Sequence, residues 1–111
     1  MTSRRDLLAA LVALAAAPAL ARAQMSDAFA GLDPDAVQRM GKAWREQHPN
    51  ASARELTARL FPVGRGPDAL PRLRAQAAAD FRKGAVFAYR GWRLSDTEGA
   101  LLALLSIEGR P

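Results

Sequence analysis

Residues 95–107 read Ser-Asp-Thr-Glu-Gly-Ala-Leu-Leu-Ala-Leu-Leu-Ser-Ile, and this stretch decides the fold. Its first four residues match the capping box, in which a Ser hydroxyl and a Glu carboxylate satisfy each other's unpaired backbone amides. A helix therefore begins here, and it is apolar almost all the way round. Because a surface helix shows a single apolar stripe, this helix must be surrounded. Either the other helices wrap around it, or another protein completes one of its faces.

The segment just before this helix, residues 86–94, changes to a period of two and fits a β-hairpin that turns at Arg90-Gly91. A type I′ turn would force Arg90 to positive φ, where Asn or Asp is commoner, so a longer loop is the alternative. Since an isolated hairpin is barely stable in water, we expect it to lie on the helices with its aromatic face inward. In this register two pairs share that face: Tyr89 with Trp92, and Phe87 with Leu94.

Three further helices are predicted before the hairpin. The first runs from Pro34 to about Gln47 behind an Asp33 cap, with Val37, Met40, Gly41 and Trp44 on its apolar face. The second runs to about Phe61 from a capping box at Ser52–Glu55, and the third covers 68–83 and stops at Gly84. We therefore expect a mainly α fold, a small orthogonal helical domain of about four short helices with one β-hairpin, preceded by a signal helix.

The chain begins with a pattern of a different kind. Two adjacent arginines precede an apolar run of mostly Ala and Leu, and a small-x-small site follows that run. Residues 1–23 are thus predicted to be a twin-arginine signal peptide that is cleaved before Gln24. The signal residues are Arg4, Arg5, Leu7 and Leu8, and the cleavage positions are Ala21 and Ala23.

Two alternatives remain for this segment. It could be an ordinary secretion signal that happens to contain two arginines, or a permanent anchor. The run is short for a membrane span, which needs about twenty apolar residues, and Pro18 interrupts it. We therefore favour cleavage, contact with the membrane only through the signal segment, and a periplasmic domain comprising residues 24–111.

Composition limits the classes of function. Removing 23 residues from the 111 leaves 88, which suffices for one small domain. Three of the 16 Lys and Arg residues and one of the 11 Asp and Glu residues lie in the leader, so the remainder carries a net charge of +3, spread along the chain. Nucleic-acid binding needs a concentrated basic patch, so we expect none. The absence of cysteine excludes disulfides, thiolate metal sites and cysteine nucleophiles.

The residues that could carry chemistry have structural explanations. His48 stands beside Pro49 at a helix end, which is typical of a helix cap. No His, Asp or Glu cluster has metal-ligand spacing, and no haem-attachment or dinucleotide motif is present. We predict no catalytic residue, no metal and no cofactor, hence a protein that is not an enzyme; a small hydrolase would need a nucleophile and a base that we do not find. Five carboxylates fall in helix first turns, where the macrodipole accounts for them: Asp33, Asp35, Glu55, Asp96 and Glu98.

The layout resembles small exported bacterial accessory proteins. The features that carry the resemblance are the leader, the small helical body, Asp80-Phe81-Arg82-Lys83-Gly84, Gly91-Trp92, and the Thr97-Glu98 helix start. The chain is similar to the small subunits of membrane-associated flavin dehydrogenases acting on sugars, sugar acids or alcohols, of the gluconate 2-dehydrogenase subunit 3 type. This resemblance implies a subunit without a cofactor that aids folding, flavin insertion or export of the large flavoprotein.

These observations lead to one expected function and one alternative. Twin-arginine cargo is usually folded around a cofactor, and we find no cofactor motif in this chain, so we expect the signal to export a complex. The chain would be a non-catalytic accessory subunit that helps fold, mature or carry a larger periplasmic oxidoreductase. Its partners would be the twin-arginine translocase and the larger, cofactor-containing dehydrogenase subunit. The alternative is a stand-alone periplasmic binding or self-associating helical protein. The aromatic residues belong either to the core or to a binding surface, for which we name Trp92, Leu94, Leu101, Leu105 and Tyr89.

Overall fold

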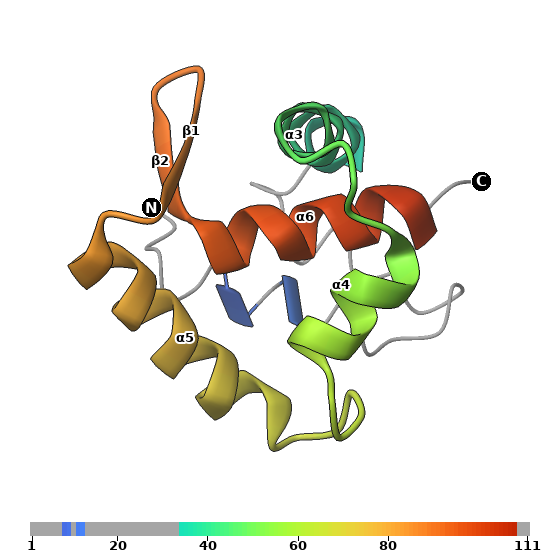
Figure 1. Ribbon diagram of the computed structural model, residues 1–111, viewed down its shortest axis with the longest axis vertical. Coiled ribbons are helices and arrows are strands. Elements are labelled where there is room, and N and C mark those ends of the chain that lie inside the picture. The colour runs from blue at the N-terminus through green and yellow to red at the C-terminus, as the bar shows by residue number, and fades with distance from the viewer. Residues whose placement is uncertain (1–7, 10, 13–33, 109–111) are drawn as a thin grey trace.

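The computed structural model describes residues 8–9, 11–12 and 34–108. Within 34–108 the fold is mainly helical, with four helices and a two-stranded antiparallel hairpin (Figure 1). This confirms the predicted class. The elements, in order, are α3 (Pro34–Gln47), α4 (Ala53–Leu60), α5 (Ala69–Lys83), β1 (Val86–Tyr89), β2 (Trp92–Ser95) and α6 (Asp96–Glu108).

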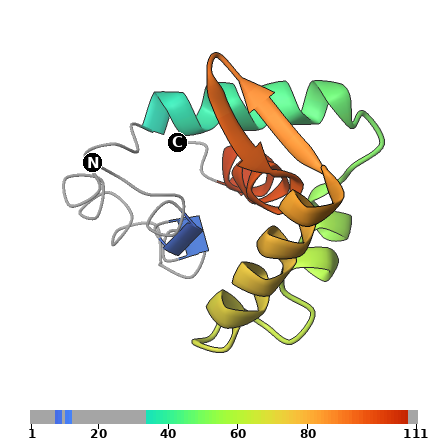
Figure 2. The same cartoon turned by 90° about the vertical axis from the view of Figure 1, so that its left-hand side faces the viewer.

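Helix α6 lies at the centre of the domain. Its ten residues from Thr97 to Ser106 are all buried, and the five from Ala100 to Leu104 have no exposed surface. Because successive helical residues are turned by about 100°, five in a row point in every direction around the axis. Figure 2 looks along α6, with α3 above it and α5 below it. Of the two alternatives for the last helix, the structure shows the first: the helix lies at the centre and the other helices surround it.

Helices α3 and α6 approach each other closely at two glycines. A Cβ atom on Gly41 would overlap the carbonyl oxygen of Leu102 and would lie 2.6 Å from Cβ of Ser106. A Cβ atom on Gly99 would overlap the ring of Trp44. The predicted apolar face of α3 is therefore the one that packs on α6, and only glycine at these two positions permits this separation.

The start of α6 is held by buried carboxylates. In the predicted capping box, Glu98 Oε1 accepts from the backbone N–H of Ser95 (2.8 Å), and Ser95 Oγ accepts from the N–H of Glu98 (3.0 Å). Asp80 of α5 adds a link that the sequence did not predict: its Oδ2 accepts from the N–H (2.8 Å) and the hydroxyl (2.6 Å) of Thr97. The first turn of α6 is thus fixed to α5 as well as capped.

The other helix ends follow their local signals. Ser52 caps α4, since its Oγ accepts from the N–H of Glu55 at 3.1 Å. Helix α4 ends at Leu60, one residue before the predicted end, and α5 begins at Ala69 behind Asp68. Gly84 ends α5 in the left-handed conformation, with φ of 76°.

The hairpin has the predicted register but only half of the predicted packing. Phe87 pairs with Leu94 and Tyr89 with Trp92, and the turn places Arg90 at φ of 48°. The expectation that the whole aromatic face points inward is wrong for Trp92, which is 48% exposed. The reason is geometric: the end of the hairpin near the turn extends beyond the helices (Figure 1), so the pair next to α6 is buried, whereas Tyr89 packs against the core only in part.

The predicted leader is described only in part. Arg4, Arg5, Leu7, Ala21 and Ala23 lie outside the described residues. Residues 8, 9, 11 and 12 are helical, and the side chains of Leu8, Leu11 and Val12 belong to the same buried hydrophobic cluster as α6. None of the helices in the described ranges is both long and apolar enough to cross a membrane.

Candidate functional site

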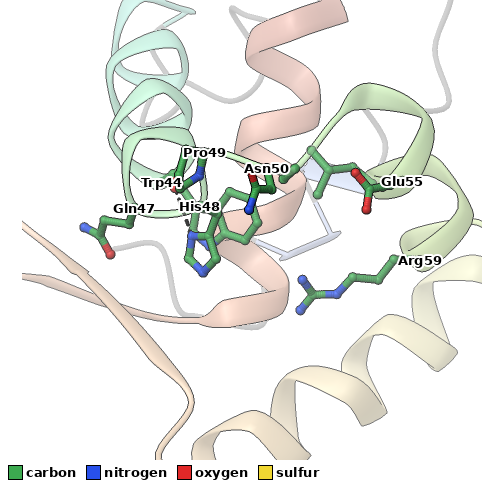
Figure 3. A pocket seen from close by; sticks show the side chains of 9 residues that line it. Trp44, Gln47, His48, Pro49, Asn50, Glu55 and Arg59 are labelled. Carbon is green, nitrogen blue, oxygen red and sulfur yellow. Dashed lines mark hydrogen bonds between the residues drawn. The ribbon is translucent and has the colours of Figure 1, made fainter.

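A shallow pocket of about 520 Å³ lies where the end of α3 meets α4 (Figure 3). Imidazole, guanidinium, carboxylate and amide groups all reach it. The chain forms this pocket because Pro49 follows the end of α3 and the capping box then starts α4 in a new direction. The lining residues are Trp44, Gln47, His48, Pro49, Asn50, Ala51, Glu55, Leu56 and Arg59.

The carboxylate of Asp96 joins three helices beside this pocket. Its Oδ1 accepts from the indole N–H of Trp44 on α3 at 3.0 Å, and its Oδ2 accepts from the guanidinium of Arg59 on α4 at 2.8 Å. Asp96 is itself the first residue of α6. One side chain therefore ties the start of the central helix to the two helices that flank the pocket.

His48 stacks on Trp44 and caps α3. The two ring centroids are 3.8 Å apart and the planes differ by 10°. Nδ1 of His48 lies 2.9 Å from the carbonyl oxygen of Trp44, and because a carbonyl only accepts, Nδ1 carries the proton. This contact confirms the predicted helix cap. The other ring nitrogen, Nε2, lies 3.7 Å from Oδ1 of Asp96, which is beyond hydrogen-bond distance.

The surroundings of Asp96 favour its charged form. Partial burial alone would raise the pKa of its carboxyl, but the hydrogen bonds from Arg59 and Trp44 and the charges of Arg59 and His48 outweigh that effect. The pKa of Asp96 is therefore lower than its usual value. An ionised Asp96 at neutral pH keeps Arg59 and Trp44 in place.

The ionisable groups around the pocket are engaged in holding the fold together. Arg59 pairs with Asp96, His48 caps α3, and Glu55 accepts a hydrogen bond from the hydroxyl of Ser52 at 3.2 Å. The nine lining residues include no Ser, Thr, Tyr, Lys or Cys that could serve as a nucleophile. In the described ranges, no group of three or more His, Cys, Asp or Glu side chains is arranged to hold a metal ion.

A second candidate is the hairpin tip, which comprises Arg90, Gly91, Trp92 and Arg93. All four residues are exposed. The guanidinium carbon of Arg90 lies 5.5 Å from the centroid of the Tyr89 ring, within the range of a cation–π contact. The tip therefore presents one indole ring with a positive charge on either side of it in the sequence.

The structure separates the residues predicted to bind a partner. Trp92 is exposed and Tyr89 is half-buried, whereas three leucines belong to the core: Leu94 at 1%, Leu101 at 0% and Leu105 at 4% exposure. A partner can reach these leucines only if an element that covers them moves away. Sequence reasoning also missed the role of Asp96 in joining helices, because its partners lie 37 and 52 positions away and no local pattern marks them.

The chain matches no known family model, no curated protein and no solved structure.

Proposed function

We propose that this chain is a non-catalytic accessory subunit that is exported with a larger periplasmic oxidoreductase through the twin-arginine route, and that it binds this partner through the hairpin tip. The exposed indole of Trp92 carries the proposal. Two large hydrophobic side chains are exposed in the described part of the chain, Trp92 and Val63, and only Trp92 stands on a paired, projecting element.

The composition of the hairpin tip suits a protein interface. Trp, Tyr and Arg are the residues most enriched where binding energy is concentrated, since they combine large apolar area with polar or charged ends. Arg90 is exposed at the turn next to Tyr89, whereas the exposed Arg93 pairs with Ala88 and so projects from the opposite face of the hairpin. A fitting partner surface would offer an apolar pocket for the indole and a rim of Asp or Glu side chains.

The polar groups around the pocket bond to one another and to neighbouring helices, which supports the non-catalytic part of the proposal. A catalytic acid or base needs to be directed at a substrate, whereas Asp96 and Arg59 are directed at each other and at neighbouring helices. Their arrangement fits a domain whose charged groups fix the positions of short helices. This is useful in a small protein without disulfides.

The proposal is tested by purifying a C-terminally tagged full-length chain from the native periplasm, followed by mass spectrometry and an absorption spectrum. We expect a stoichiometric larger protein with flavin absorbance. The Trp92→Ala variant should lose this protein while its melting temperature stays within a few degrees of the parent, because a surface substitution changes stability by about 0.5 kcal/mol.

Val63→Ala is the matched control, because Val63 is 79% exposed but stands in the loop between α4 and α5. It should retain the partner. Equal retention by both variants would contradict binding through the hairpin tip, and a colourless, lone chain would contradict the accessory role.

The same exposed indole also supports the alternative, a stand-alone protein that associates with itself. In that case the full-length chain purified alone would sediment as a dimer, and Trp92→Ala would sediment as a monomer. A monomeric parent chain rules out this candidate.

A further inference from the structure

Three polar side chains converge on the pocket between α3 and α4. In Figure 3, Arg59 extends toward His48, and the carboxamide of Asn50 lies above the space between them. His48 and Arg59 also lie against one carboxylate, that of Asp96: Nε2 of the imidazole is 3.7 Å from Oδ1, and Nη2 of the guanidinium is 2.8 Å from Oδ2. An imidazole, a guanidinium and a carboxamide therefore reach the same pocket.

The turn that carries Asn50 is held by its own hydrogen bond. The backbone N–H of Ala51 donates to the carbonyl oxygen of His48 at 3.0 Å, which closes a four-residue turn. Pro49 stands at the second position of this turn, where its ring restricts φ. Asn50 follows it and is exposed. Its backbone is thus already ordered, so a ligand that bonds to the carboxamide does not have to order this turn.

The three groups differ in whether they donate or accept. Nδ1 of His48 donates to the carbonyl of Trp44, so Nε2 of the neutral ring is an acceptor, and its distance from Asp96 is too long for a hydrogen bond. Arg59 offers donors only: its bond to Asp96 uses Nη2, and Nη1 carries two further N–H groups. The carboxamide of Asn50 both donates and accepts.

This pattern selects a neutral amide. A carboxylate or phosphate would place its oxygen against the lone pair of His48 and near the charge of Asp96, and an ammonium group would face the guanidinium of Arg59. A hydroxyl both donates and accepts, but from a single atom. An amide does so from two atoms: its oxygen accepts from Arg59 while its N–H donates to His48, and the carboxamide of Asn50 is complementary to both.

The shape of the pocket indicates what carries the amide. Sites for free small molecules usually enclose most of the ligand, whereas this pocket is shallow and open on one side (Figure 3). Such a pocket suits one group of a longer chain. We infer that it binds an amide of an extended protein segment, either the peptide group of its backbone or the side chain of an Asn or Gln. This inference goes beyond the proposed function and does not involve the hairpin tip.

The test is a titration of the full-length chain, labelled with ¹⁵N, with four small probes. Acetamide, acetate and acetone have nearly the same shape, but only acetamide both donates and accepts; N-methylacetamide represents a peptide group. The readouts are the side-chain NH₂ signals of Asn50 and the ring signals of His48. We expect saturable shifts with both amides, and about fivefold weaker binding of acetate and acetone, which each lack one hydrogen bond. Tighter binding of N-methylacetamide assigns the site to the backbone, and tighter binding of acetamide assigns it to a side chain.

Two matched variants show whether the probes bind at this pocket. Asn50→Asp replaces the NH₂ donor by an oxygen of similar size and should weaken acetamide binding about fivefold. Gln47→Glu makes the same change at another lining residue, whose side chain points away from Arg59 in Figure 3, and should leave binding unchanged. Both positions are exposed, so both variants should fold. The inference is overturned by equal binding of acetate and acetamide, by equal effects of the two variants, or by the absence of any saturable shift.

Discussion

Replacing Gly41 by alanine is the sharpest test of how the domain is packed. Gly41 lies in the middle of α3, against the backbone of α6. The added Cβ atom would overlap the carbonyl oxygen of Leu102 and would lie 2.6 Å from Cβ and 2.7 Å from Oγ of Ser106. A backbone carbonyl cannot rotate away as a side-chain end can, so α3 and α6 must separate.

The expected effect follows from two opposing contributions. Overpacking a close contact costs about 1–3 kcal/mol, and contact with backbone places this site near the upper end of that range. Alanine in place of glycine inside a helix stabilises the folded state by about 1 kcal/mol, because alanine has the higher helix propensity. The free energy of unfolding should therefore fall by about 2 kcal/mol, which lowers the melting temperature of a domain of this size by roughly 10 °C.

The assay is thermal and urea denaturation of the full-length chain, followed by circular dichroism and by the fluorescence of buried Trp44. Gly66→Ala is the control, since a Cβ atom at Gly66 would meet nothing within 4 Å and its φ is not in the left-handed region. It should be neutral or slightly stabilising. A Gly41→Ala chain as stable as the Gly66→Ala chain would refute the close approach of α3 and α6.

Two further substitutions test the carboxylates at the start of α6. Asp96→Asn should lower stability at pH 7 by about 1 kcal/mol, because the carboxylate no longer pairs with Arg59. Since the folded-state pKa of Asp96 is below its usual value, this contribution is present at neutral pH and is lost as the pH falls through the folded-state pKa. In urea titrations, the parent and Asp96→Asn chains should therefore differ in stability at pH 7 and become equally stable in the acid range. A difference that stays constant with pH would contradict the pairing. Asp80→Ala should cost about 3 kcal/mol, because the buried N–H and hydroxyl of Thr97 lose their acceptor. The control is Asp68→Ala, because the exposed Asp68 makes no side-chain cap bond at the start of α5, and this variant should change the urea midpoint little. Equal losses of stability in the two variants would contradict a special role for Asp80.

The elements that could be predicted from sequence are those whose cause lies within a few residues. Ser52 with Glu55 and Ser95 with Glu98 are capping boxes that close locally, and the structure contains both. Gly84 ends a helix because a left-handed residue is needed there and glycine adopts that conformation without a Cβ penalty. The hairpin register could likewise be predicted, since the turn and the alternation of side chains fix it together.

The features that sequence could not supply depend on distances between elements. The exposure of Trp92 is set by how far the hairpin extends past α6, and no residue of the hairpin encodes that length. The link from Asp96 to Trp44 joins positions 52 apart, and at sequence level a first-turn acid has a sufficient local explanation in the helix dipole. The candidate site was therefore only partly predictable: Trp92 is at the surface, but Leu94, Leu101 and Leu105 are not.

The uniform apolarity of α6 connects the packing of the domain to the proposed route of export. A helix that is buried on all sides requires a cover that is complete, and Leu8, Leu11 and Val12 supply part of it. Between residues 7 and 21 the proposed leader is mostly Ala, with Leu and Val at intervals. Such a segment can bury one stripe against leucines, yet it gains less from entering a membrane than a run of Leu and Ile would. For the proposed signal peptide, this composition therefore favours contact with the folded domain over early entry into the bilayer.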